Sequence, residues 1–175
     1  EMFDAVRDGR IKAIWIACTN PAHSLPELSR VREALQTAEF VVVQDAWADT
    51  ETAAFADLLL PAATWGEKDG TVTNSERRIT RVRAAVPPPG EARADWRIAR
   101  DFALALSENL TESRHPGESR DPGSAPEAWI PAFAGMTDEK RPPATAESLF
   151  AFTTPAEVYA EHVATTVGRD LDIGA

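Results

Sequence analysis

Residues 11–45 read IKAIWIACTNPAHSLPELSRVREALQTAEFVVVQD, and apolar and polar segments alternate along them. The apolar, β-branched run at 11–17 has the length of a strand and stops at a polar Cys-Thr-Asn-Pro turn, which indicates a buried strand. A second apolar run at 39–45 closes on Gln and Asp. With a helix between them, the two runs predict a βαβ unit whose strands are parallel.

The connecting helix is predicted to begin at Ser24. The segment Ser24-Leu25-Pro26-Glu27 has the spacing of a capping box with proline inside the first turn. Apolar side chains then recur at helical intervals on one face, at Leu28, Val31, Leu35 and Ala38.

Further elements follow the βαβ unit. A short helix is predicted at 50–57, and LLLP at 58–61 reads as a third strand that proline stops. The segments 71–73 and 77–86 predict a β-type excursion. A stiff polyproline connection at 87–95 then leads to a helix capped by Asp95, with its apolar face at Trp96, Ile98, Ala99, Phe102, Ala103 and Leu106.

Composition divides the chain into three parts. Residues 1–106 form the α/β segment, and 107–147 are rich in Pro, Gly, Ser, Arg and Glu, which predicts a disordered inserted loop. Residues 148–175 contain a final helix, because Thr154-Pro155-Ala156-Glu157 forms a second capping box. The expected fold class is therefore α/β, a Rossmann-like parallel sheet flanked by helices, with a disordered insertion and a C-terminal helix.

The composition restricts the function. The 175 residues carry 28 Asp and Glu against 18 Lys and Arg, a net charge of −10, which argues against nucleic acid as a partner because counterion release needs a basic face. No run has the roughly 20 apolar residues that span a bilayer, so we expect no membrane and a cytoplasmic location. The single cysteine, Cys18, excludes an internal disulfide or a four-cysteine metal site made by this chain alone. The first residue is Glu1, so we expect a piece of a longer protein.

Polar residues stand where the predicted strands end, and open parallel sheets bind ligands outside the carboxyl ends of their strands. Asn20 follows the first strand, and Gln44 and Asp45 close the second. Asp45 could accept hydrogen bonds from a ribose or from the N–H pair of a guanine edge, or it could simply cap the next helix. No G-x-G-x-x-G follows either strand, which disfavours an ordinary NAD or FAD site.

The stretch WGEKDGTVTNSERRITRVR at 65–83 concentrates basic side chains in an acidic chain. Lys68 lies in a tight turn, where it could meet a phosphate or a heterocycle carbonyl, or merely be solvated. Arg77 and Arg78 could clamp a phosphate or pair with neighbouring carboxylates. Asp95 is either a helix cap or an acceptor for a pterin or guanine amidine edge. No Ser-His-Asp arrangement and no metal-ligand spacing emerges, so no catalytic or metal-binding residue is assigned.

Three stretches together resemble a known family: IKAIWIACTNPAHSLPE, FVVVQDAWADTETAAFADLLLPAATWGEKDGTVTNSERR and PPGEARADW. They are similar to the third domain of the molybdopterin-guanine-dinucleotide oxidoreductases, which include nitrate reductases, formate dehydrogenases and dimethyl sulfoxide reductases. The resemblance covers about residues 2–106. The tail EVYAEHVATTVGRDLDI at 157–173 looks like the segment that follows in bacterial assimilatory nitrate reductases.

The resemblance implies a cofactor and its contacts. In such enzymes two molybdopterin guanine dinucleotides hold the molybdenum, and electrons arrive from a donor protein or domain through a 4Fe-4S cluster. The dinucleotide contacts would fall on Asn20, Gln44, Asp45, Lys68 and Asp95. The cluster cysteines, the molybdenum ligand and a closing barrel domain would belong to the remainder of the chain, so this segment alone is not expected to reduce nitrate.

Alternatives remain open at this point. The core stretch is almost as similar to formate dehydrogenase as to nitrate reductase. The chain could also be a nucleotide-binding module without catalysis, or an inactive remnant, because 113–141 has no counterpart in the family and resembles a translated repetitive intergenic element. A surface loop tolerates such lengthening, since each doubling of loop length costs about 0.6 kcal/mol.

Overall fold

The computed structural model describes residues 1–112 and 145–169. It divides into two compact units, which are described separately below. The first contains Glu1–Ile98 together with the segment from Thr154 onward, and the second contains Ala99–Thr153. Among the described residues, no helix is long and apolar enough to cross a bilayer.

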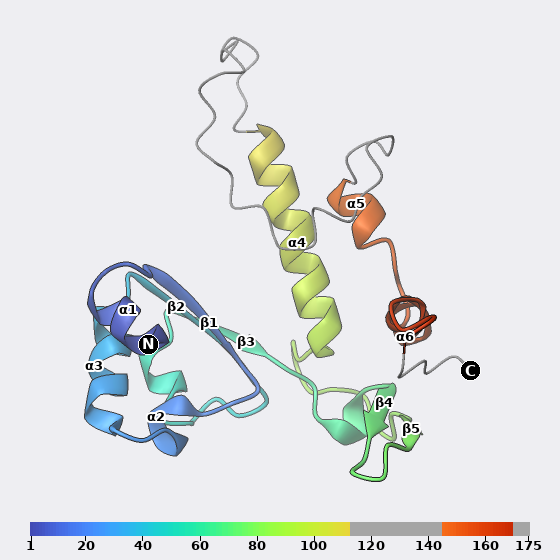
Figure 1. Ribbon diagram of the computed structural model, residues 1–175, viewed down its shortest axis with the longest axis horizontal. Helices are drawn as coiled ribbons and strands as arrows, with labels where there is room; N and C mark the ends of the chain where they lie inside the picture. The colour runs from blue at the N-terminus through green and yellow to red at the C-terminus, as the bar shows by residue number, and fades with distance from the viewer. Residues whose placement is uncertain (113–144, 170–175) are drawn as a thin grey trace. The chain divides into compact units, whose positions relative to one another are not determined.

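A parallel three-stranded sheet is the centre of the first unit (Figure 1). It consists of β1 (Ala13–Ala17), β2 (Phe40–Asp45) and β3 (Leu58–Pro61), in the order β1-β2-β3. The register pairs Ile16 with Val43 and Val43 with Leu59. The predicted strands and their parallel pairing are confirmed, and the chain has the expected α/β fold.

Two helices cover one face of this sheet. They are α1 (Met2–Arg7), which the sequence analysis did not predict, and α3 (Leu28–Thr37). Alternate strand residues and the apolar helix faces form a single core, which contains Val6, Ile14, Ile16, Ala22, Val31, Ala34, Leu35, Val41 and Val43. Burial of such side chains is worth about 1.5–3 kcal/mol each, so this core is the main source of stability in the unit.

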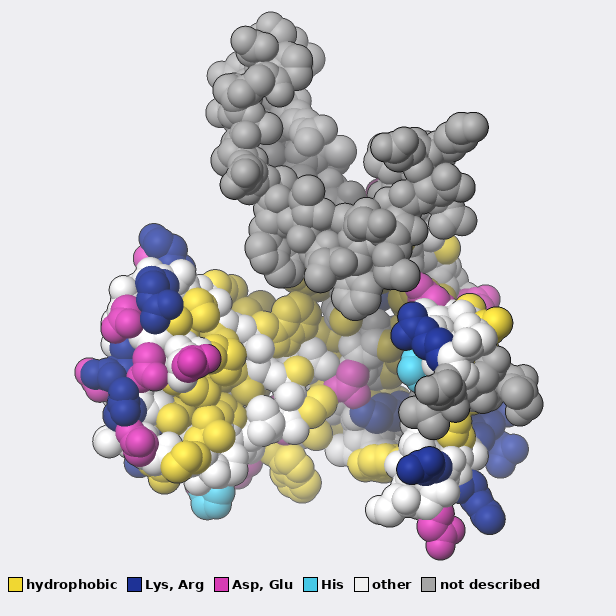
Figure 2. Space-filling view, in the orientation of Figure 1, with side chains coloured by type: hydrophobic (Ala, Val, Ile, Leu, Met, Phe, Trp, Pro, Cys, Tyr) yellow, Lys and Arg dark blue, Asp and Glu magenta, His cyan; other side chains and the backbone are white. Residues whose placement is uncertain are grey.

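Ion pairs join the outer surfaces of α1 and α3. Arg7 Nε lies 3.0 Å from Glu33, and Arg30 Nη2 lies 2.7 Å from Asp4. In Figure 2 basic and acidic side chains accordingly alternate along one side of this body, next to a broad patch of hydrophobic side chains. Because water and salt screen these exposed pairs, each contributes little to stability.

The predicted start of the connecting helix is wrong. Residues Pro21–Ser24 form a separate short helix, α2, and α3 begins at Leu28 with Glu27 as its N-cap. Leu25 is extended, with φ −84° and ψ 152°, because a residue that precedes proline is disfavoured in the helical region. The break at Leu25-Pro26 therefore prevents Ser24 and Glu27 from forming a capping box.

The segment after β2 also differs in detail from the prediction. The short helix expected at 50–57 is a single 3-10 turn, η1 (Ala53–Phe55). A second 3-10 turn, η2 (Trp65–Glu67), follows β3, and the Thr64 and Glu67 side chains form a capping box around it. The predicted β excursion is confirmed as an antiparallel hairpin of β4 (Gly70–Thr73) and β5 (Ile79–Val82).

The polyproline connection returns to the sheet beside β3. Ala62 and Arg93 form a parallel bridge, and Ala63 N donates a 2.8 Å hydrogen bond to the Arg93 carbonyl. In turn, Arg93 N donates to the carbonyl of Pro61 at 3.1 Å. These bonds place the next helix, α4 (Asp95–Glu112), so that it begins at the carboxyl edge of the sheet.

Two more helices are described after the gap. In the second unit, α5 (Ala146–Leu149) is followed by Phe150, whose carbonyl accepts a 3.1 Å hydrogen bond from Arg100. In the first unit, α6 (Pro155–Ala164) contacts β4 and has the predicted capping box of Thr154 and Glu157. Residues 113–144, most of the predicted inserted loop, lie outside the described residues. The division into 1–106, 107–147 and 148–175 stays a prediction.

Candidate functional site

A cavity of about 410 Å³ lies at the carboxyl edge of the sheet. Small-molecule sites have volumes of about 300–1,000 Å³, and this edge is where open parallel sheets bind their ligands. The turns after the three strands and the start of α4 supply its walls. The lining residues are Cys18, Thr19, Asn20, Asp45, Ala46, Trp47, Thr50, Ala62, Ala63, Thr64, Trp65, Lys68 and Asp95.

Asp95 is the centre of a hydrogen-bond network in this cavity. Its Oδ1 accepts from the Gln44 amide at 2.9 Å and from the Cys18 thiol at 3.4 Å, and its Oδ2 accepts from Lys68 Nζ. Gln44 is only 4% exposed, so its amide depends on this partner. The network ties the ends of β1 and β2, the turn after η2 and the start of α4 to one carboxylate.

The network shifts two ionisation equilibria. Burial by itself raises the pKa of Asp95, but hydrogen bonds from Lys68 and Gln44, with the Lys68 charge, outweigh it and hold the pKa below its ordinary value. The pKa of Cys18 is raised, first by loss of water around the thiol and then by the charge of Asp95 and the hydrogen bond to it. The thiol therefore stays protonated and donates to Asp95 at neutral pH.

Asn20 is engaged on both sides of its amide. Its Nδ2 donates to Glu51 at 2.7 Å, and its Oδ1 accepts from the backbone N–H and the hydroxyl of Thr52, at 3.2 and 2.6 Å. Thr52 is fully buried and its hydroxyl also accepts from Ala22 N at 3.1 Å. The Asn20 hydrogen bond is the main cause that lowers the pKa of Glu51. Asn20 therefore fixes the turn after β1 against the segment that precedes η1.

Asp45 has a different environment. Its Oδ1 accepts a 3.2 Å hydrogen bond from the backbone N–H of Trp47, which closes a local turn. Among the described residues, the other carboxylate oxygen has no hydrogen-bond partner. The helix-cap interpretation of Asp45 is wrong, because the N-cap of the next helical turn is Thr52.

The structure brings the predicted site residues together. Asn20, Asp45, Lys68 and Asp95 line one cavity, and Gln44 contacts it through Asp95. Arg77 and Arg78 lie outside this cavity, on the hairpin. Within the described part of the chain they form no ion pair with neighbouring carboxylates. Asn74 does brace this loop, since its Oδ1 accepts from Arg78 N at 3.0 Å.

The sequence analysis missed the two tryptophans that line the cavity. Trp47 is 67% exposed and Trp65 is 63% exposed, although both are large apolar side chains. Each stands in a polar segment shortly after a strand end, and that position is the sequence signal that could have drawn attention to them.

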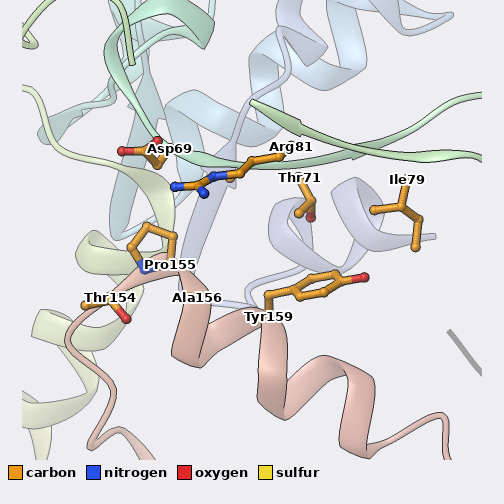
Figure 3. A pocket seen from close by; sticks show the side chains of 9 residues that line it. Asp69, Thr71, Ile79, Arg81, Thr154, Pro155, Ala156 and Tyr159 are labelled. Carbon is orange, nitrogen blue, oxygen red and sulfur yellow. The ribbon is translucent and has the colours of Figure 1, made fainter. Parts of the chain in front are cut away.

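A second cavity, of about 490 Å³, lies between the β4–β5 hairpin and α6 (Figure 3). The side chains of Arg81 and Tyr159 extend along it, and Asp69 and Thr71 contribute further polar groups. None of the predicted site residues lines it. Since it also lies away from the carboxyl ends of the parallel strands, the cavity around Asp95 is the better candidate site. Nowhere in the described residues do three or more His, Cys, Asp or Glu side chains gather as a metal site.

The comparisons with known proteins match the segment that contains this cavity. The model of the family "Molybdopterin oxidoreductase" matches residues 1–105, the segment that contains the whole sheet and every residue of the candidate site. The chain belongs to the molybdopterin oxidoreductase family. The family resemblance is therefore confirmed, and with it an oxidoreductase family whose name implies a molybdenum–pterin cofactor.

Curated members of the molybdopterin oxidoreductase family match the same segment. A nitrate reductase from Klebsiella oxytoca is 56% identical over 106 residues, which is 61% of this chain and 12% of that protein. The assimilatory nitrate reductase catalytic subunit of Bacillus subtilis is 44% identical over 106 residues, 61% of this chain and 15% of that one. The F420-dependent formate dehydrogenase subunit alpha of Methanocaldococcus jannaschii is 52% identical over 96 residues, 55% of this chain and 14% of that one.

A solved structure also has this molybdopterin oxidoreductase fold. Acetylene hydratase from Pelobacter acetylenicus superposes with a TM-score of 0.55 and 25% sequence identity, over 63% of this chain and 16% of that one. The chain thus spans only about a seventh of the length of the relatives it matches.

Proposed function

We propose that this chain is part of the catalytic subunit of a molybdenum bis(molybdopterin guanine dinucleotide) oxidoreductase that reduces nitrate to nitrite. In this proposal the cavity at the carboxyl edge of the sheet binds one pterin–guanine dinucleotide. The observation that carries the proposal is the convergence of Asn20, Asp45, Lys68 and Asp95 on that cavity from four separate segments. Parallel strand ends alone would bring Asn20 and Asp45 to one edge, but Lys68 and Asp95 reach the cavity from the turn after η2 and from the start of α4.

The donors and acceptors present fit such a ligand. Lys68 Nζ has three N–H groups and gives one to Asp95, so donors remain for a phosphate or a carbonyl oxygen. Asp45 keeps one carboxylate oxygen without a partner among the described residues. When bound, the molybdenum–pterin group would supply the redox chemistry. The residues of this chain would bind the dinucleotide, orient it and fix its charge, which is how proteins generally serve such cofactors.

The remaining parts of the reaction belong to the rest of the oxidoreductase chain. The proposal assigns to it the cysteines of a 4Fe-4S cluster, the molybdenum ligand and the surface that receives an electron-donor protein or domain. It places the enzyme in the cytoplasm. Nitrate is the favoured substrate because the nitrate reductase from Klebsiella oxytoca is 56% identical, against 52% for the archaeal formate dehydrogenase subunit. Formate oxidation is the alternative, since those two identities lie close together.

Binding can be tested on the 175-residue chain. Titration with guanosine diphosphate in a calorimeter should give saturable binding, and Asp45→Ala should weaken it by about 10- to 100-fold, as expected for a hydrogen bond to a charged group. Asp69→Ala, a carboxylate of the second cavity, is the matched control and should leave binding unchanged. Absence of binding, or a loss with Asp69→Ala alone, would contradict the proposal.

The substrate is tested on the complete subunit expressed with its cofactor. Reduced viologen should be oxidised by added nitrate, and formate should not reduce an oxidised dye. The opposite pair of results would replace nitrate reduction by formate oxidation, while leaving the cofactor site in place.

A further inference from the structure

We infer that Trp47 and Trp65 hold a flat heterocycle in the cavity by stacking, while Asp45 binds the hydrogen-bonding edge of the same ring. The heterocycle belongs to the 2-amino-4-oxopyrimidine class, which guanine and pterin share. This inference rests on the proposed function and extends it, because it assigns two binding residues that the sequence analysis did not consider.

The exposure of the two indoles is the first observation. Trp47 is 67% exposed and Trp65 is 63% exposed, and both line the cavity together with Asp45 and Lys68. A large apolar ring left in water forgoes the stabilisation that burial would give it. A flat ring stacked on the tryptophan would bury the indole and supply that stabilisation. Aromatic stacking is a general way in which proteins hold nucleobases.

The local turn at Asp45 links stacking to edge recognition. The backbone N–H of Trp47 donates to Asp45 Oδ1 at 3.2 Å, so the carboxylate and the indole are carried by one short turn after β2. Trp65 reaches the same cavity from the turn after β3. A ring held between these turns would present its edge to Asp45 while its faces contact the indoles.

Among the polar residues of the cavity, Asp45 has the most hydrogen-bonding capacity left for a ligand. Both oxygens of Asp95 already accept bonds, from Gln44, Cys18 and Lys68. The Asn20 amide is likewise used on both sides. Asp45 has one oxygen free of partners in the described structure, and its other oxygen accepts only one bond. Asp45 is therefore the acceptor most available to a ligand.

The carboxylate of Asp45 favours a ligand that offers two parallel hydrogen-bond donors. Guanine and pterin present a ring N–H beside an exocyclic amino group, and these two parallel donors match the two oxygens of a carboxylate. Adenine presents an unprotonated ring nitrogen at the corresponding edge. That nitrogen is a hydrogen-bond acceptor and would face the carboxylate of Asp45, which also only accepts. We therefore expect the cavity not to bind adenine.

The experiment follows tryptophan fluorescence and calorimetry with guanosine monophosphate, a soluble pterin and adenosine monophosphate as probes. We expect guanosine monophosphate to quench the emission of the 175-residue chain, and Trp47→Ala and Trp65→Ala each to weaken binding by about 10-fold. Trp47→Phe and Trp65→Phe should retain most of the affinity, because phenyl rings also stack. In the double Phe variant the quenching should fall, although three tryptophans remain elsewhere in the sequence.

Phe40→Ala is the matched control. Phe40 is also an exposed aromatic residue, but it stands at the other, amino-terminal end of β2, so its removal should leave binding unchanged. Circular dichroism checks that each variant folds. Binding of the pterin in place of the nucleotide supports the same ring class and assigns the cavity to the pterin end of the cofactor.

The outcomes separate this inference from the proposed function. If no probe binds the unmodified chain, the proposed function fails and the inference fails with it. If guanosine monophosphate binds but Trp47→Ala and Trp65→Ala bind it as well as the unmodified chain, the function stands and the stacking role is wrong. Equal binding of adenosine monophosphate would overturn the edge recognition by Asp45.

Discussion

The side-chain amide of Gln44 donates a 2.9 Å hydrogen bond to Asp95, across 51 positions of sequence. Gln44 is the next-to-last residue of the central strand, whereas Asp95 begins a helix that follows a hairpin and a polyproline segment. This bond places the start of α4 against the edge of the sheet. Because Lys68 and Cys18 donate to the same carboxylate, a single residue holds the cavity together.

Asp95→Asn should destabilise the protein at neutral pH, by about 1–2 kcal/mol, because Lys68 then faces an uncharged partner. The folded protein holds the pKa of Asp95 below its ordinary value of 3.8. The stabilisation is therefore present above that value and is lost as the pH falls through the folded pKa. Urea unfolding at pH 7 and pH 3 should show a large difference between the two proteins at pH 7 and a smaller one at pH 3.

Asp69→Asn is the control for this experiment, since Asp69 is an exposed carboxylate of the same unit that makes none of these bonds. It should unfold like the unmodified chain at both pH values. If Asp95→Asn lowers the free energy of unfolding equally at pH 7 and pH 3, the charge on Asp95 does not contribute to stability.

Cys18 should react slowly with iodoacetamide, because its raised pKa leaves little thiolate at pH 8. Asp95→Asn removes the negative charge beside the thiol, so the rate should rise several-fold. The chain has no other cysteine, and mass spectrometry of the alkylated protein therefore reports on this site alone. An unchanged or slower rate in the variant would show that Asp95 does not contribute to the raised pKa of Cys18.

Asn20→Asp should lower the midpoint of chemical denaturation. The substitution replaces the donor that bonds Glu51 at 2.7 Å by a second negative charge. Asn74→Asp is the matched control, because Asn74 is used only through its Oδ1, which aspartate retains. Chemical denaturation should separate the two variants, and similar losses for both would show that the Asn20 donor is unimportant.

Arg77→Gly should stabilise the hairpin, by about 0.5 kcal/mol. Arg77 has φ of +62°, a left-handed conformation that costs a residue with a side chain about 1–2 kcal/mol but costs glycine almost nothing. Glycine is also more flexible in the unfolded chain, and this offsets part of the gain. A thermal-shift measurement should detect a small increase in the melting temperature. Arg78→Gly, which lacks the positive φ, should lower it.

The apolar runs at 11–17, 39–45 and 58–61 were enough to predict the three strands and the parallel pairing of the first two. The convergence of Asn20 and Asp45 followed from the rule that parallel strands end at one edge. The approach of Asp95 could not be derived that way, because it depends on the bridge between Ala62 and Arg93, which no local pattern encodes. The residue pattern left Asp95 as either a helix cap or a ligand acceptor, and the family resemblance added it to the cofactor contacts.

Local signals failed where two of them competed. Ser24 and Glu27 have capping-box spacing, but the restriction that Pro26 places on Leu25 prevailed and delayed the helix to Leu28. The exposure of Trp47 and Trp65 is a tertiary property, so an apolar residue in a polar segment could not be assigned to the surface or the core from sequence.

Four separate stretches of chain build the walls of the cavity around Asp95. A molecule that contacts all four stretches would hold them together. Its binding free energy would add to the free energy of unfolding and raise the melting temperature. At 100 times its dissociation constant such a molecule adds about 2.7 kcal/mol. Because proteases cut the transiently unfolded chain, the protein with such a molecule bound should be cleaved more slowly than the empty protein.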